Sequence, residues 1–404
     1  MVSIYTISDK ALMGKQINLL SAYIAESFFK SNIKTDKQCV VGCTADFSKC
    51  IDENEIQIFL VDKSCNSLNQ YICDLTRNVI IENPYAKNSI FEHYKKLNQP
   101  MEKGVENEWK MPSQAKAIIN PMNTTQGYIL EHNNTIYCVL PNIYDEARIM
   151  FDDVVLEYIL KEQKKKYRSY TFKSFGLGID FITKLIEPEI KNKSKVSINL
   201  FEKPMEVDIV LKSIDTNKEL DEIAKNVFLK LDKYIYSVED IPIEKVVYNL
   251  LKLNQVKVSF AEDITCGALC ENLTKQAEDA VNFIDKSIVV PNLESKMTTL
   301  GIDKSVVDSQ GEVSPNVVYQ MAVNLLRSST SDIVVANVGK FTTSGSTQNG
   351  LCYIAVGDRN EIHVYKNTFK GNFKNIIDSA TVSSYFYLIK KLKKNDFHLD
   401  KNTI

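Results

Sequence analysis

The sequence predicts an α/β protein built from three successive modules. In residues 1–160, short apolar runs alternate with a segment whose apolar residues recur every three or four positions, which is typical of strands alternating with helices. Between residues 161 and 240, closely spaced strand-like runs replace this alternation. Residues 241–404 alternate again. The first and last parts therefore predict layered α/β domains, and the middle part predicts a small α+β module.

In the first module, residues 3–8, 56–61 and 135–140 are predicted strands, the last of them ended by Pro141. A helix is predicted for residues 16–30, because apolar residues three or four positions apart share one helix face. These apolar residues are Ile17, Leu20, Ile24 and Phe28.

The middle module contains three predicted strands, at residues 169–175, 195–201 and 206–212. One helix separates the first two strands, and a second helix is predicted for residues 217–232. The last two strands are close enough in sequence to form a hairpin. Pro242 marks the exit from the module, because the residue before a proline disfavours helix.

In the third module, Ser314 followed by Pro315 predicts the start of a helix, since serine caps helices and proline is favoured at their first position. A closing helix is predicted for residues 372–391. The Ser/Thr/Gly-rich residues 339–350 lack the spacing of a phosphate-binding loop, and we expect a flexible loop at a pocket edge. Predicted strands are residues 256–260, 332–338, 351–356 and 361–366.

The composition excludes several classes of protein. The chain is 44% hydrophobic and 25% charged, as globular proteins are, and its net charge of −2 gives no global attraction to nucleic acid or anionic membrane. It contains no apolar run long enough to span a membrane and does not begin like a signal peptide. The nine cysteines include no Cys-x-x-Cys pair, so we expect reduced thiols in a cytoplasmic protein. The four scattered histidines predict no metal site, and we expect no cofactor.

Residues 261–267 read Ala-Glu-Asp-Ile-Thr-Cys-Gly, between a predicted strand and a predicted helix. They resemble the Ala-Glu-Ser-Cys-Thr-Gly-Gly turn of the competence/damage-inducible protein A (CinA) family, in which the serine is the proposed nucleophile. The resemblance implies a molybdopterin-binding-like domain at residues 1–160, a middle module at 161–240 and a nicotinamide mononucleotide (NMN) deamidase-like domain at 241–404. It also implies a homodimer.

Three segments of the first module resemble the same family. They are residues 8–18, residues 120–127, which resemble Asn-Pro-x-Gly-Thr-Ala-Pro-Gly, and residues 140–146, which resemble Leu-Pro-Gly-Pro-Pro-x-Glu. After the strand at 56–61, the family carries a glycine-rich phosphate loop with paired aspartates. This chain has no glycine there, and Asn69 and Gln70 replace the aspartates, which removes the main attraction for a hard cation.

The resemblance also implies the site residues of the third module. Asp263, Thr265 and Lys296 are the candidate catalytic residues, since amide hydrolysis needs a nucleophile and a basic group. Glu262, Gly267 and Gly339 are the candidate substrate-binding residues. Other positions depart from the family pattern: Cys266 replaces a glycine, Pro291 a tyrosine, residues 337–342 the Thr-Gly-Ile-Ala-Gly-Pro loop, and Phe373 an arginine.

Each of these residues also has a plain structural interpretation. Asp263 is either a nucleophile or base, or the N-cap of the following helix. Lys296 is either a functional group or a solvated helix lysine. Cys266 and Cys270 are either thiolates favoured near a helix start or small core residues, the interpretation that we favour.

The sequence is therefore consistent with two functions. The first is a CinA-like pseudoenzyme that binds a nucleotide or a protein partner without turning it over. The second is a divergent NMN deamidase that uses Lys296 with Asp263 or Thr265 to hydrolyse the carboxamide to the acid and ammonia.

Overall fold

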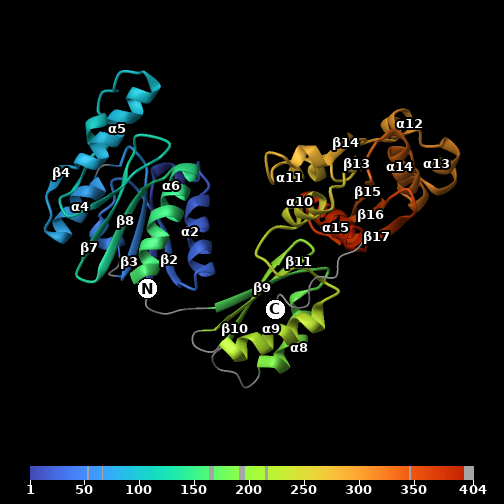
Figure 1. Ribbon diagram of the computed structural model, residues 1–404, viewed down its shortest axis with the longest axis horizontal. Helices are drawn as coiled ribbons and strands as arrows, with labels where there is room; N and C mark the ends of the chain where they lie inside the picture. Colours follow the sequence, from blue (N-terminus) through green and yellow to red (C-terminus); the bar gives the residue numbers. More distant parts are fainter. Residues whose placement is uncertain are drawn as a thin grey trace. The chain divides into compact units, whose positions relative to one another are not determined.

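The structure is a computed structural model that describes residues 1–51, 54–65, 67–162, 168–190, 196–213, 217–344 and 347–394. The chain divides into two compact units, Met1–Tyr167 and Arg168–Ile404. The second unit contains a four-stranded sheet and a five-stranded sheet (Figure 1). The predicted α/β class is confirmed, while the division into three domains stays a prediction.

The first unit is built on a six-stranded sheet with the order β2-β1-β3-β8-β7-β6. The first four of these strands are parallel, and the last two are antiparallel to their neighbours. Its elements are β1 (Val2–Ile7), α1 (Asp9–Leu12), α2 (Leu19–Lys30), β2 (Thr35–Val41), α3 (Phe47–Cys50), β3 (Ile56–Val61), α4 (Ser67–Thr76), β4 (Ile80–Glu82), α5 (Pro84–Leu97), η1 (Val105–Asn107), β5 (Lys110–Pro112), β6 (Lys116–Ile118), β7 (Gly127–His132), β8 (Thr135–Pro141), α6 (Tyr144–Met150), η2 (Phe151–Val155) and α7 (Leu156–Glu162).

Helices cover both faces of this sheet. Successive strand residues point to opposite faces, so Ile4 packs with the residues of α2 and α6, while Tyr5 packs with those of α4 and α5. Figure 1 shows α2 and α6 on one side of the sheet and α4 and α5 on the other. The predicted helix start was too early. The chain turns at Gly14, which has a φ of +69°, and Ile17 is 79% exposed ahead of α2.

The middle module is an antiparallel sheet with the order β10-β11-β9-β12, and helices α8 and α9 share its core. The predicted hairpin is confirmed, because Lys203 pairs with Glu206 across a two-residue turn. Residue 195, the predicted start of the second strand, lies outside the described residues. The elements are β9 (Arg168–Phe175), α8 (Ile179–Ile190), β10 (Val196–Lys203), β11 (Glu206–Ser213), α9 (Asn217–Leu231) and β12 (Ile235–Ser237).

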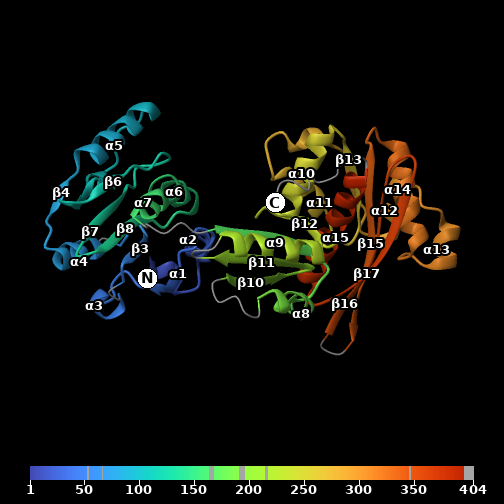
Figure 2. The same cartoon turned by 60° about the horizontal axis from the view of Figure 1, so that its bottom comes forward.

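The third module is a five-stranded sheet with the order β14-β13-β15-β16-β17, parallel up to β15 and antiparallel beyond it. Residues of α10 and α15 pack on one face, and residues of α12 and α14 pack on the other (Figure 2). The elements are α10 (Ile243–Asn254), β13 (Val258–Glu262), α11 (Ala268–Thr274), η3 (Ala280–Phe283), β14 (Ile284–Val289), α12 (Leu293–Leu300), α13 (Lys304–Gln310), α14 (Pro315–Ser328), β15 (Ile333–Ser344), β16 (Thr347–Gly357), β17 (Ile362–Lys370) and α15 (Phe373–Lys394).

The middle and third modules share a hydrophobic core within the second unit. Phe175 at the end of β9 stacks on Phe386 of α15, with ring centroids 4.0 Å apart. Tyr236 of β12 belongs to the same cluster, and its carbonyl accepts a hydrogen bond from Lys393. Helix α15 therefore packs against the edge of the middle sheet.

The expected loop at residues 339–350 is instead a β-hairpin. β15 and β16 pair continuously from Val334 to Ser344, and residues 345–346 lie outside the described part of the chain. The prediction was wrong because it relied on the small polar composition. Threonine suits an exposed strand, and Gly339 is needed for packing, since a Cβ there would lie 2.5 Å from the Ile264 side chain.

The expectation of reduced cysteines also fails at one place. Cys43, after β2, and Cys65, after β3, form a disulfide with their Cα atoms 5.0 Å apart. The fold brings these loops together from positions 22 residues apart, so spacing alone gave no indication. None of the described helices has the length and apolar character that a bilayer crossing requires.

Candidate functional sites

Three polar residues meet where neighbouring parallel strands of the first unit end. Ser8, Asp62 and Asn142 directly follow β1, β3 and β8. The Asp62 carboxylate accepts hydrogen bonds from the Ser8 hydroxyl at 2.6 Å and from the Asn142 amide at 2.9 Å. The three loops are therefore tied together at one edge of the sheet, where ligands of α/β proteins usually bind.

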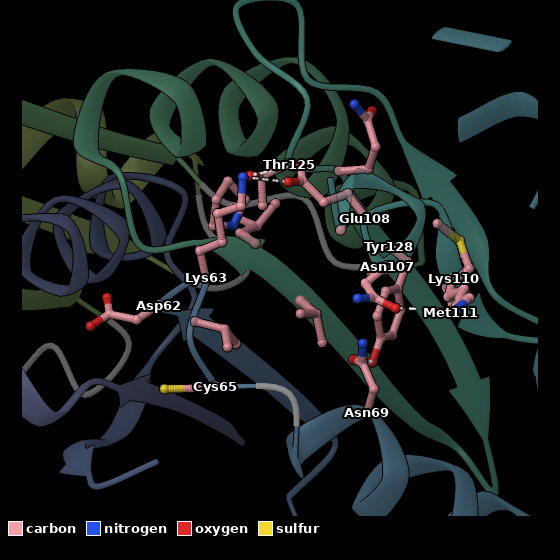
Figure 3. Close-up of a pocket in the computed structure, with 16 residues that line it drawn as sticks. Asp62, Lys63, Cys65, Asn69, Asn107, Glu108, Lys110, Met111, Thr125 and Tyr128 are labelled. Carbon is pink, nitrogen blue, oxygen red and sulfur yellow. Dashed lines mark hydrogen bonds and ion pairs between the residues drawn. The ribbon is translucent and has the colours of Figure 1, made fainter. Parts of the chain in front are cut away.

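A pocket of about 270 Å³ lies beside this junction and has polar walls (Figure 3). Lys63 reaches Glu108 at 2.5 Å, and the Thr125 hydroxyl donates to the other oxygen of that carboxylate at 3.1 Å. The hydrogen bond that Lys63 donates to the Glu108 carboxylate raises the pKa of Lys63. Lys110 donates to Asn107 at 3.1 Å. These charges are partly paired with one another inside the pocket.

Asn69, one of the two amides that replace the family's aspartates, lines this pocket. Its side-chain oxygen accepts a hydrogen bond from the buried Tyr128 hydroxyl at 2.8 Å. Gln70 instead donates to Asp74 on the helix surface. Among the described residues, no group of three His, Cys, Asp or Glu side chains could hold a metal ion. Asn69 therefore serves as a hydrogen-bond partner of Tyr128 at the position of one of the family's aspartates.

The other two motifs of the first unit meet through Glu146, which is buried. Its carboxylate accepts hydrogen bonds from the side-chain amides of Asn120 at 2.7 Å and Asn123 at 3.0 Å. The Asn120 side-chain oxygen in turn accepts from the backbone N–H groups of Met122 and Asn123. The residues of these two motifs thus stabilise the conformation of one loop through hydrogen bonds.

In the third module, Glu262 ends β13 and is fully buried. Its carboxylate accepts hydrogen bonds from the backbone N–H groups of Gly267, Leu269 and Cys270 at 3.0, 3.1 and 3.2 Å. Such N–H groups at a helix start have no partner within the helix. Glu262, and not Asp263 as the N-cap interpretation held, therefore satisfies the start of α11.

The Thr265 side chain forms hydrogen bonds with residues of both β13 and β15. Its hydroxyl donates to Glu262 at 2.7 Å and accepts from the Asn337 amide at 2.7 Å. Asn337 pairs with Glu262 in the parallel β13–β15 register, and its side-chain oxygen also accepts from the Asp263 N–H at 3.1 Å. Thr265 is 1% exposed, so its hydroxyl does not face a substrate.

Asp263 and Lys296 form the centre of a three-residue charge cluster. The Lys296 ammonium lies 3.3 Å from Asp263 and 2.7 Å from Glu312. The second oxygen of Asp263 accepts from the Gly339 N–H at 3.0 Å. Lys296 is 1% exposed, so the expectation of a solvated helix lysine was wrong. α12, the turn after β13 and the turn before α14 supply the three charges.

Burial raises the pKa of Asp263 above its ordinary value, while the Gly339 N–H and the Lys296 charge oppose the shift. The nearby Glu312 carboxylate adds to it. Of the three side chains in the cluster, only Glu312 is substantially exposed, at 39%. Glu312 therefore stands between the buried pair and water.

The structure brings all the candidate residues of the third module together at the end of β13, on α12 and on β15. Cys266 does not meet the core expectation, because it is exposed and has a φ of +52°. Cys270 does meet it, since it is partly buried and packs against the hydrophobic core of the module. Burial raises the pKa of the Cys266 thiol, and the charges of Asp263 and Glu262 add to this. A thiolate is therefore disfavoured at Cys266. Phe373 packs edge-on against Phe341, with ring centroids 4.9 Å apart.

Sequence reasoning did not identify Glu312 as a site residue. A signal was present, because Gly311-Glu312-Val313-Ser314 resembles the family's Gly-Ala-Val-Ser with a carboxylate in place of a methyl group. Glu108 and Tyr128 of the first unit gave no signal, because they lie in no motif and become neighbours of Lys63 and Asn69 only through the fold.

Comparisons with known proteins found similar sequences. The family model described as the CinA C-terminal domain matches residues 240–392. A Caldicellulosiruptor saccharolyticus relative described as a competence-damage inducible protein is 26% identical over 97% of this chain and 99% of its own length. A CinA-like protein of Kosmotoga olearia is 25% identical over 96% of this chain and 98% of its own length.

Among solved structures, a CinA superfamily protein of Klebsiella pneumoniae is 23% identical and covers 38% of this chain and 96% of its own, with a TM-score of 0.35. The protein CinA of Thermoplasma acidophilum, described as having unknown function, is 16% identical over 39% of this chain and 96% of its own, with a TM-score of 0.34.

The mixed sheet with the Glu262 turn at the end of β13 thus defines a protein with a CinA C-terminal domain. The resemblance extends over nearly the whole length of the relatives. Residues 240–392 therefore form a CinA C-terminal domain, and the chain as a whole is similar to competence-damage inducible proteins.

Proposed function

We propose that this chain is a CinA-family pseudoenzyme that binds a nucleotide or a protein partner and does not hydrolyse the carboxamide of NMN. The proposal places it in the cytoplasm as a homodimer. One observation carries the proposal: Asp263 and Glu312 both bind the Lys296 ammonium, where the family pattern has a serine and an alanine. An ammonium held in this way has no lone pair with which to activate a nucleophile.

The neighbouring groups support the same conclusion. A nucleophilic hydroxyl must reach the substrate and lie within hydrogen-bond distance of a base. Thr265 is buried, and its hydroxyl already bonds Glu262 and Asn337. The Gly339 N–H, a candidate donor for a developing oxyanion, already donates to Asp263.

The first unit supports binding without turnover in the same way. Its pocket offers Lys63 and Lys110 for an anionic ligand, but amides stand where paired aspartates would hold a divalent cation. Phosphoryl or pyrophosphate cleavage depends strongly on such a cation.

Ammonia release from NMN by the purified full-length protein tests the proposal. We expect no release above a buffer blank, together with NMN binding by calorimetry or a partner recovered with the wild type. Ammonia release that Lys296→Ala abolishes would overturn the proposal and establish the divergent deamidase. The matched control is Lys304→Ala, an exposed lysine at the start of α13.

The Asp263→Ser and Glu312→Ala double variant restores the family pattern around Lys296. We expect no ammonia release from it either, because Thr265 stays buried and Pro291 and Phe373 stay in place of the family's tyrosine and arginine. Activity in the double variant alone would show that two substitutions suffice to account for the loss.

A further inference from the structure

The disulfide between Cys43 and Cys65 connects two loops at the carboxyl edge of the first unit's sheet. Cys43 follows β2 and Cys65 follows β3, and both strands pair with β1 between them. The Cα separation of 5.0 Å lies within the usual range for disulfides. A hydrogen bond from the Ser67 hydroxyl to the Cys43 carbonyl, at 2.8 Å, joins the same two loops.

The disulfide is part of the wall of a pocket. Cys65 lines the 270 Å³ pocket together with Asp62 and Lys63, which precede it on the same loop (Figure 3). Cys65 is 6% exposed, whereas Cys43 is half-buried and can be reached from solvent. The Cys65 N–H also donates to the Asp62 carbonyl at 2.8 Å, so the loop between them is a tight turn. Fixing Cys65 thus fixes the backbone that carries Lys63.

We propose that Cys43 and Cys65 are a reversible redox modification site that controls the mobility of the Lys63 loop and hence of the pocket wall. In the oxidised state the loops after β2 and β3 are covalently joined. In the reduced state the Ser67 hydrogen bond remains to join them, and the loop from Asp62 to Cys65 opens more often. This proposal does not depend on whether the third module hydrolyses NMN.

The chemistry needs an oxidant of the disulfide class, such as oxidised glutathione. The thiolate of Cys43, the more accessible residue, attacks one sulfur of the oxidant, forming a mixed disulfide and releasing one glutathione thiolate. The Cys65 thiolate then attacks the Cys43 sulfur and releases the second glutathione. Two protein thiols are oxidised by two electrons, one glutathione disulfide is reduced, and the two thiol protons pass to the two glutathione thiolates.

Three of the other cysteines are less suited to this role. Cys73, Cys138 and Cys352 are buried, and burial raises the pKa of each thiol. Reaction with an oxidant requires an accessible thiolate. Cys39, on β2, is partly exposed and free, so it serves as a matched control.

The test equilibrates the full-length protein with glutathione buffers from fully reduced to fully oxidised, traps free thiols with N-ethylmaleimide and maps the linked peptides by mass spectrometry. We expect the Cys43–Cys65 peptide pair to appear and disappear reversibly across the series, and Cys39→Ser to behave like the wild type. Hydrogen exchange of the amides of residues 62–65 should be at least about threefold faster in the reduced protein, while exchange in β13 stays unchanged.

The Cys43→Ser variant should show the fast exchange at every glutathione ratio. Fluorescence of Trp109, the single tryptophan of the chain and part of the same core as Cys65, checks that the variant is folded. Two results on the wild type alone would overturn the proposal: a linkage that never forms or never breaks across the series, or identical exchange of residues 62–65 in both redox states.

Discussion

Glu312 approaches Lys296 to 2.7 Å and so places a second carboxylate on an ammonium that Asp263 already contacts. The lysine is almost fully buried, and Glu312 is the partner open to water. Removing a charge from such a cluster leaves the remaining charges without compensation, which usually costs more than the intact pair contributes.

Lys296→Met is therefore expected to lower the free energy of unfolding of the second unit by about 3 kcal/mol, because Asp263 loses the cation that offsets its burial. Urea unfolding followed by circular dichroism measures this loss. Trp109 fluorescence follows the first unit separately and should not change. Lys304→Met, at an exposed position, should lie within about 0.5 kcal/mol of the wild type. An equally stable Lys296→Met protein would contradict the importance of the cluster.

Glu262→Gln is expected to cost about 2 kcal/mol, because the carboxamide places an N–H₂ group against backbone N–H donors that now bond the carboxylate. Hydrogen exchange of the Leu269 and Cys270 amides should speed up with the loss of stability. The control is Glu271→Gln on the exposed side of α11, whose partner is Lys275 on the surface. Unchanged protection at Leu269 would show that the helix start does not depend on Glu262.

Gly339→Ala is expected to destabilise the second unit by about 1–3 kcal/mol. The added Cβ would lie 2.5 Å from Ile264 Cδ1 and 3.0 Å from the Leu351 carbonyl oxygen. Thermal unfolding should show a lower midpoint for this variant, and Gly178→Ala, where no atom lies within 4 Å of the new Cβ, should unfold like the wild type. A hairpin that accepts both substitutions equally would disprove the close approach of β15 to Ile264.

Lys212 on β11 predicts a pH dependence. Burial lowers the pKa of its ammonium to about 8, so the charged form costs stability below pH 8, and this cost disappears as the pH rises towards 10.5. The stability of the wild type should therefore rise relative to that of Lys212→Met as the pH increases from 8 to 10.5, by about 1–3 kcal/mol.

The difference between the two proteins should change steadily between pH 8 and 10.5 and stay constant above about pH 10.5. Urea unfolding at pH 7, 8, 9 and 10 measures it, and the comparison with Lys218→Met, on the exposed side of α9, removes the contribution of ordinary lysines. A stability difference that does not change with pH would show that Lys212 keeps its ordinary ionisation.

Much of the fold could be predicted, because patterns of neighbouring residues determine many of its helices and strands. The apolar run of β3 and the short connection between β10 and β11 each needed only a few neighbouring residues. Residues 339–350 could not be predicted from composition, since their structure depends on the ladder with β16 and on the space left beside Ile264.

The candidate site, like the fold, could be predicted only in part. The resemblance located Asp263, Thr265 and Lys296, and the structure places them together. The resemblance did not indicate that Thr265 is buried or that Glu312, in the turn before α14, contacts Lys296. Both facts depend on which loops the parallel strands bring side by side. The Cys43–Cys65 pair was missed for the same reason.

The stacking of Phe175 on Phe386 has a consequence for how the second unit unfolds. With Tyr236 also in the shared core, the middle sheet cannot separate from α15 without exposing aromatic surface to water. The two modules are thus coupled energetically and should melt in one cooperative transition. Pro242, which marks the predicted exit from the middle module, then lies inside a single cooperatively folded unit.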